Sequence, residues 1–207
     1  MVSRPTTTSF AILGLLSVQP WTAYELVAQS KRSLHWFWPR SEANLYAELK
    51  RLVERGHAEA EVVDGRRRQR TRYTITQQGR AALDEWLGTK PTAPSLEVEA
   101  LLRMILADQG SLDDLRTAIA ATTLQAREMR ASGVALTKDL LTTGGPFPER
   151  LHLTERAVTF YADFIHLVLL WCHETSAEIE TWPDTRDVGM TPKVRKRLER
   201  VVNLPEP

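Results

Sequence analysis

Hydrophobic residues recur at helical spacing in three short stretches near the start of the chain. These stretches cover 8–18, 22–32 and 41–56. The second opens with a Thr-x-x-Glu capping box formed by Thr22 and Glu25, and Ser41 is placed to cap the third. The leucines of the third stretch share one face, as in an amphipathic helix. Three short helices in this order predict the core of a helix-turn-helix.

After these helices the spacing of the hydrophobic residues changes from a helical period to the alternation of strands. Two segments, 57–63 and 71–76, read as strands, and the Asp-Gly pair at 64–65 is a strong turn signal between them. Thr76 is placed to cap a further helix over 77–87, and two prolines in 88–94 indicate a hinge. This order of elements predicts a winged helix-turn-helix.

Everything beyond the hinge has a helical pattern. Helices are expected over 95–108, 111–130 and 153–180, with a Gly-Pro-rich loop at 143–148. The segment 160–171 is apolar on more than one face, so a second copy of the chain is expected to help cover it.

The pattern therefore predicts a mainly α protein in three parts. An N-terminal winged helix-turn-helix domain that binds DNA is expected over 1–90, and an all-helical C-terminal dimerisation domain over 91–183. For the tail, 184–207, the pattern leaves a docked basic helix and a frayed end both open.

The net charge of +1 does not indicate a binding partner, but the distribution of charge along the chain does. Residues 1–90 hold 14 basic and 9 acidic side chains, whereas the remainder holds 13 basic and 17 acidic ones. Only the first part suits a polyanion. The single cysteine fits a reducing compartment, and the apolar run at the N-terminus is too short to span a membrane and lacks a cleavage motif. A cytoplasmic, unprocessed protein without a membrane partner is expected.

Arginines crowd at the tip of the predicted hairpin. They are Arg66, Arg67, Arg68, Arg70 and Arg72. On a projecting hairpin their guanidinium groups suit the phosphates or the minor groove of double-stranded DNA. A solvated charge run is the alternative for an isolated cluster. The predicted helix just before it favours DNA, because groove and phosphate contacts are needed together.

The third helix is expected to turn a polar face to DNA, opposite its leucines. That face is predicted to carry Ser41, Asn44, Glu48, Lys50 and Arg51, with Arg40 just before it. Asn44 would read adenine, and Arg40 would read guanine or bind a phosphate. Tyr46 is ambiguous between packing and a hydroxyl contact to phosphate. Asn44 is also open to the simpler role of supporting the first turn, and Lys50 and Arg51 are open to that of exposed helix-forming residues.

Four aromatic rings, His35 to Trp38, precede this helix. They are interpreted first as a staple that packs the turn against the C-terminal half of the domain, with stacking on a ligand or sugar-phosphate as the alternative. An effector pocket for a planar apolar compound is a further hypothesis. Its lining would be Trp36, Trp38, Tyr161, Phe164 and His166, which would otherwise be core residues.

No catalytic motif is present, and no cofactor or metal site is expected. His166 and His173 are seven residues apart, which is about 10 Å along a helix and too far to share one ion. An enzyme is therefore the weakest hypothesis. A protein-interaction module that keeps the winged-helix shape without binding DNA is the main alternative, although clustered arginines argue against it.

One run of residues resembles the PadR family of bacterial transcriptional regulators. Its features are Leu45-Tyr46, Leu49 with Leu52, Gly56, the basic segment Arg66 to Arg70, and Arg72-Tyr73-Thr74-Ile75-Thr76 through Gly79 to Leu83. The resemblance covers about 8–90, and the helical segments beyond it are similar to the longer subfamily with a helical dimerisation domain. It implies a homodimeric repressor that binds an inverted-repeat operator and releases it on binding a small, often aromatic, effector.

Overall fold

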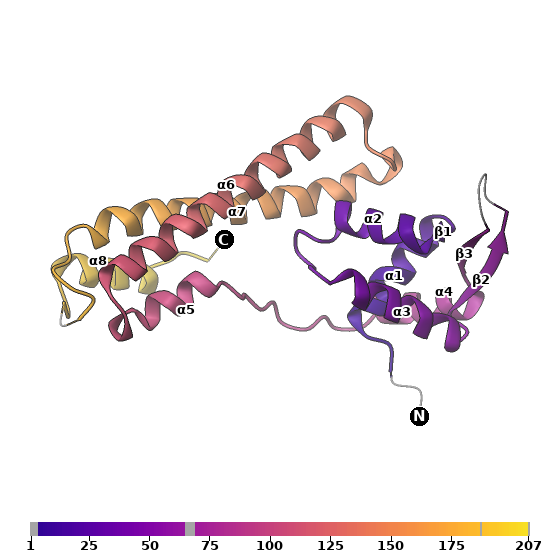
Figure 1. The fold of residues 1–207 in the computed structure, drawn as a ribbon, viewed down its shortest axis with the longest axis horizontal. Coiled ribbons are helices and arrows are strands. Elements are labelled where there is room, and N and C mark those ends of the chain that lie inside the picture. The colour runs from indigo at the N-terminus through magenta and orange to yellow at the C-terminus, as the bar shows by residue number, and fades with distance from the viewer. Residues whose placement is uncertain (1–3, 65–68, 187, 207) are drawn as a thin grey trace. The chain divides into compact units, whose positions relative to one another are not determined.

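The computed structural model describes residues 4–64, 69–186 and 188–206. The chain divides into two compact units, Met1–Pro94 and Ser95–Pro207, each of which is described by itself. Helices dominate both units, and the first also holds a small antiparallel sheet (Figure 1). The predicted fold class is confirmed: mainly α, with a winged helix-turn-helix followed by an all-helical part.

The helices of the first unit begin at side-chain caps. They are α1 (Thr7–Val18), α2 (Ala23–Ser33), α3 (Glu42–Glu54) and α4 (Gln77–Leu87). Thr22 and Glu25 form the expected capping box on α2, while the hydroxyls of Ser41 and Thr76 accept hydrogen bonds from the first turns of α3 and α4. After α3, Gly56 adopts a φ of 71°. This left-handed conformation commonly ends a helix, and glycine adopts it most easily.

Three strands form the sheet of the first unit in the order β1-β3-β2. They are β1 (Trp21–Thr22), β2 (Ala58–Val63) and β3 (Arg70–Ile75). The hairpin register runs from Ala58 opposite Ile75 to Val63 opposite Arg70. The sequence did not predict β1, in which Trp21 lies opposite Tyr73. This strand ties the hairpin to the helices, because the Trp21 indole N–H donates to the carbonyl of Leu15 in α1 at 2.9 Å.

The core of the first unit is apolar and is built mainly from α1, α2 and α3. Its largest fully buried apolar side chains are Ile12, Leu13, Leu16, Leu26, Leu49 and Leu52. Helix α4 packs on α1 through parallel stacking of Phe10 and Trp86, whose ring centroids are 4.9 Å apart.

The second unit is built on two long helices that lie side by side, α6 (Leu112–Thr143) and α7 (Leu151–Ile179) (Figure 1). Its shorter elements are α5 (Glu99–Ile105), η1 (Ala107–Gln109), η2 (Pro148–Arg150) and α8 (Pro192–Val202). Helix α6 extends 13 residues beyond the predicted end at Arg130, and Gly144, with a φ of 73°, terminates it. The predicted helix over 95–108 is shortened to α5 and a single turn of 3-10 helix.

A buried cluster joins α6 to the end of α7. It consists of Leu115, Ile119, Cys172 and Ile179, with Met104, Val168, Trp171 and Trp182 packed against it. Helix α8 is attached to α7 by the buried carboxylate of Glu178, which receives hydrogen bonds from Lys193 and Arg197. Of the helices in the described ranges, none is long and apolar enough to cross a membrane.

Candidate nucleic-acid interface

Helix α3 occupies the position of a recognition helix, and its polar side chains divide between two sides. Asn44 and Arg51 are seven residues apart and share one side, whereas Tyr46 and Lys50 share the other. All four are exposed. Ser41 uses its hydroxyl as the helix cap, accepting from the Asn44 backbone N–H at 3.2 Å. The surface between the two sides is therefore available to the edges of bases.

Glu48 does not lie where the sequence analysis placed it. It was expected on the polar face of α3, but only 2% of it is exposed. Its carboxylate accepts hydrogen bonds from the Ser9 hydroxyl of α1, from Arg51 at 2.8 Å and from Arg55 at 3.2 Å. The expectation was wrong because Glu48 is three residues after Leu45 and four before Leu52, which places it on the edge of the apolar stripe.

The segment before α3 packs against α1. The Trp38 indole N–H donates to the hydroxyl of Thr8 at 3.4 Å, and the Arg40 guanidinium lies 4.3 Å from the centroid of the Trp38 ring. Trp36 donates to the carbonyl of Arg32. The expected staple against the C-terminal half of the domain is thus wrong for Trp38, whose partner is the first helix. Arg40 is held beside α3 by this stacking.

The hairpin of β2 and β3 forms the wing. Arg70 and Arg72 alternate along β3, so both lie on one face of it, and both are exposed. Arg72 is directly opposite Glu61, a cross-strand pair of opposite charge. Three of the predicted wing residues, Arg66, Arg67 and Arg68, lie outside the residues that the structure describes.

Strand β1 and the start of α2 position the wing strand. Thr22 lies opposite Arg72, and its backbone N–H and hydroxyl donate to the Glu25 carboxylate at 2.9 and 2.8 Å. These two hydrogen bonds, with smaller contributions from the charges of Arg70 and Arg72, lower the pKa of Glu25. The lowered pKa favours the ionised form of Glu25, whose charge is attracted by the two wing arginines.

The sequence analysis missed two exposed residues of α2, Tyr24 and Lys31. They are seven residues apart and share a face, which is the signal that could have identified them. Tyr24 is 77% exposed, and Lys31 forms an ion pair with Glu42 in the first turn of α3. The hydrogen bond to Glu42 raises the pKa of Lys31, and Tyr46 and Tyr24 contribute in the same direction. Helices α2 and α3 thus share one polar surface.

The residues of the hypothetical effector pocket are divided between the two units. Trp36 and Trp38 belong to the first, while Tyr161, Phe164 and His166 are in α7 of the second. Tyr161 and Phe164 contact each other with ring centroids 6.5 Å apart, and burial raises the pKa of the Tyr161 hydroxyl. His166 is exposed and does not join this aromatic pair.

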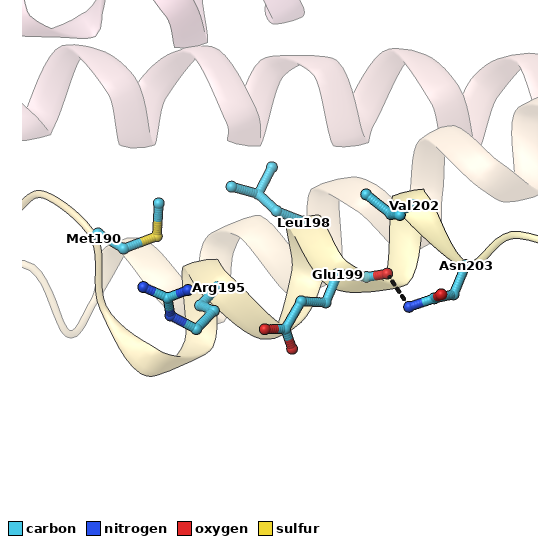
Figure 2. A pocket seen from close by; sticks show the side chains of 6 residues that line it. All are labelled: Met190, Arg195, Leu198, Glu199, Val202 and Asn203. Atoms are coloured by element: carbon cyan, nitrogen blue, oxygen red, sulfur yellow. Dashed lines mark hydrogen bonds between the residues drawn. The ribbon is translucent and has the colours of Figure 1, made fainter.

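A surface hollow of about 230 Å³ lies along α8, away from these aromatic residues in the sequence. Figure 2 shows Met190, Leu198 and Val202 projecting from one side of the segment, with Arg195, Glu199 and Asn203 completing the lining. The sequence analysis did not predict this hollow. Among the described residues, no group of three or more His, Cys, Asp or Glu side chains is arranged to hold a metal ion.

The first unit is a winged helix-turn-helix domain, the class in which a recognition helix and a wing act together on DNA. Residues 12–85 match the transcriptional regulator PadR-like family. The negative transcriptional regulator PadR of Bacillus subtilis is 32% identical over 79 residues, which are 38% of this chain and 43% of that protein. The first unit is therefore similar to the PadR-like family of transcriptional regulators, over the part of the chain where the sequence resemblance was seen.

Solved structures of Bacillus subtilis PadR share the fold. The structure in complex with operator DNA has a TM-score of 0.71 and 20% identity, covering 85% of this chain and 99% of that one. The structure in complex with p-coumaric acid has a TM-score of 0.64 and 20% identity, with 84% and 99% covered. The likeness extends over both units of this chain, whereas the matched sequence of the curated relative spans less than half of that protein.

Proposed function

We propose that this protein is a homodimeric transcriptional repressor that binds double-stranded DNA. Helix α3 enters the major groove with Asn44 and Lys50, while Arg70 and Arg72 of β3 bind backbone phosphates beside it. The observation that carries the proposal is the exposed polar surface of α3 in the same compact unit as the exposed arginines of β3. The related PadR of Bacillus subtilis, solved with operator DNA, supports it.

The salt dependence of DNA binding tests the role of the wing. Each phosphate contact contributes about 0.9 to the slope of log affinity against log salt concentration. Replacing Arg70 and Arg72 by alanine should therefore reduce the slope by about 1.8 and weaken binding to all sequences alike. Arg103→Ala, which removes an exposed arginine of α5, is the matched control and should leave the slope unchanged. An unchanged slope in the double variant would refute the role of the wing.

The base-reading role of α3 needs a different measurement. Asn44→Ala should alter the sequence preference in selection from a random DNA library, because a bidentate contact to adenine is lost, worth about 1–3 kcal/mol of discrimination. Lys50→Ala should also alter the preferred sequence, because Lys50 is proposed to enter the major groove with Asn44. Failure of the wild-type protein to bind any duplex would favour the protein-interaction module instead.

Dimerisation is proposed through α7. Leu153, Phe160 and Leu167 recur every seven residues and are 58%, 73% and 60% exposed, which forms an uncovered apolar stripe. A seven-residue apolar repeat is the pattern by which helices of two chains pack together. In such a dimer, the two copies of α3 would contact half-sites of an inverted repeat about 34 Å apart.

Sedimentation velocity tests whether the apolar stripe of α7 forms the dimer interface. Phe160→Glu should convert the dimer to a monomer, because a charge is then placed at the centre of an apolar interface. Ala162→Glu, on the opposite side of α7, introduces the same charge at an exposed position and should remain dimeric. A wild-type monomer, or a dimeric Phe160→Glu variant, would contradict the proposal.

A small aromatic effector is proposed to release the DNA. Bacillus subtilis PadR was solved with p-coumaric acid, and the Tyr161–Phe164 ring pair in α7 offers apolar surface for a planar compound. A planar aromatic acid that binds should raise the melting temperature and dissociate the DNA complex. A uniformly negative thermal-shift screen would count against this pocket.

A further inference from the structure

Glu48 connects the interior of the first unit to its proposed DNA-binding surface. Two of its hydrogen-bond donors lie inside: the hydroxyl of Ser9, which is fully buried, and the guanidinium of Arg55, whose side chain is 6% exposed. The third donor, Arg51, has a side chain that is 50% exposed. One carboxylate thus joins α1, the end of α3 and an arginine on the outer surface of α3.

The carboxylate remains charged in this position. Burial alone would raise the pKa of Glu48, but the hydrogen bonds from Ser9, Arg51 and Arg55 outweigh it and lower the pKa. A charged acceptor forms shorter and stronger hydrogen bonds than a neutral one. The guanidinium of Arg51 donates to this charged acceptor through one nitrogen, Nη1, at 2.8 Å.

A tethered guanidinium keeps the rest of its donors for another partner. Arginine has five N–H groups in a planar fork, so one edge can bind Glu48 while another binds an anion. Arg51 shares its side of α3 with Asn44, which is proposed to read a base. An anion beside that side, in a complex with DNA, would be a backbone phosphate.

We infer that Glu48 is a positioning residue for DNA binding: anchored by Ser9 and Arg55, it holds Arg51 in the orientation in which that arginine binds a phosphate. The inference rests on the proposed DNA-binding function and adds two residues to it. It gives the buried carboxylate a role beyond holding α3 against α1.

A purely electrostatic role of Glu48 and a positioning role predict opposite effects of Glu48→Gln on the affinity for DNA. Glu48→Gln removes a negative charge near DNA, so a purely electrostatic effect would tighten binding. If Glu48 positions Arg51, the same change should weaken binding several-fold, because Arg51 must then be ordered during complex formation. The glutamine side chain also carries an amide NH₂ group, and an arginine guanidinium cannot accept a hydrogen bond from it.

A double-mutant cycle separates this role from folding. The affinity for a fluorescein-labelled duplex of random sequence would be measured by anisotropy at several salt concentrations for the wild type, Glu48→Gln, Arg51→Ala and the double variant. Arg51→Ala should lose about tenfold in affinity and about 0.9 in salt slope. In the Arg51→Ala background, Glu48→Gln should cause no further loss, whereas it should still lower the melting temperature because Ser9 and Arg55 lose their partner.

Two further variants keep the test decisive if Glu48→Gln folds poorly. Ser9→Ala removes one of the two buried donors that anchor Glu48 but keeps the carboxylate and its charge, so it should lower the melting temperature and weaken DNA binding by a smaller factor than Glu48→Gln does. Arg51→Lys keeps the charge without the planar fork and should lose affinity nearly as Arg51→Ala does. The inference is overturned if the wild type binds but Glu48→Gln binds as tightly, if the two substitutions are additive, or if Arg51→Lys behaves as the wild type. Absence of wild-type binding would instead overturn the proposed function itself, and the inference with it.

Discussion

The attachment of α8 to the second unit depends on one buried carboxylate. Glu178 accepts hydrogen bonds from Lys193 at 2.7 Å and from Arg197 at 2.5 Å, and its side chain is 7% exposed. Both cations are about half exposed. We expect that replacing Lys193 and Arg197 by alanine releases α8, because Glu178 is then buried without those two donors and regains hydration only if the helix lifts away.

The free energy lost with these two hydrogen bonds can be bounded from the exposure of Glu178, Lys193 and Arg197. An ion pair that is fully exposed contributes up to about 1 kcal/mol, and one that is fully buried costs about 3–5 kcal/mol to break. Two half-exposed cations on one buried carboxylate lie between these limits, at about 2 kcal/mol together. The equilibrium constant for local opening of α8 should therefore rise about thirtyfold, with little change in global unfolding.

Hydrogen exchange measured by mass spectrometry on peptides covering 192–202 reports this opening. Lys196→Ala with Arg200→Ala is the matched control, since it removes the same charge from exposed positions of the same helix. Equal exchange in the two double variants would show that the hydrogen bonds to Glu178 do not attach α8, and the reasoning would be refuted.

The pH dependence of α8 exchange has a definite sign. Burial opposes ionisation of Glu178, but the hydrogen bonds from Lys193 and Arg197 outweigh it, and its pKa lies below the usual value. A carboxyl whose folded pKa is depressed contributes its full stability above its unfolded pKa, about 4.3, and loses it as the pH falls through the folded value. After correction for intrinsic exchange, protection of α8 should therefore be constant near neutral pH and decline only below about pH 4.3.

Two further predictions concern the junction of α3, β2 and α4. Gly79→Ala should lower the free energy of unfolding by about 3 kcal/mol in urea titrations, because an added Cβ would lie 2.1 Å from the backbone carbonyl oxygen of His57. Gly14→Ala in α1, where nothing lies within 4 Å, should instead stabilise by up to about 1 kcal/mol, and equal effects of the two changes would contradict the close approach. Thr76→Val should cost about 1–2 kcal/mol, because its hydroxyl donates to the Gly56 carbonyl at 2.6 Å and accepts from the Gly79 N–H at 3.0 Å. Thr76→Ser keeps the hydroxyl and should lose less in the same titration; the opposite order would exclude the cap as the cause.

The sequence predicted the elements of the first unit where the signals were local. The caps at Thr22, Ser41 and Thr76 each involve residues within one turn, so the starts of α2, α3 and α4 could be read directly. The same holds for β2 and β3, whose strand-forming segments are short and close in sequence. Local chemistry of this kind depends little on the rest of the fold.

Elements that depend on distant partners were missed or cut short. Strand β1 has two residues, too few to show a period, and exists because Trp21 and Thr22 pair with a strand about fifty residues later. Helix α6 continues through Ser132 and Gly133, a poor helix-forming pair that costs about 1 kcal/mol per glycine. Its packing along α7 offsets that cost, and packing of this kind is invisible in a single stretch of sequence.

At Glu48, the helical periodicity of α3 and the charge of the side chain predict opposite positions. Residues 45, 48, 49 and 52 follow the i, i+3, i+4, i+7 pattern of a buried stripe, so helical geometry alone places Glu48 inward. Its charge argued for an outward position, since a lone buried carboxylate is strongly unfavourable. The charge is tolerated because Ser9, 39 residues earlier, and Arg55 both donate to it. Where periodicity places a charge inside, the sequence should therefore be searched for distant donors, and the carboxylate should be regarded as a candidate for positioning a neighbour rather than as surface.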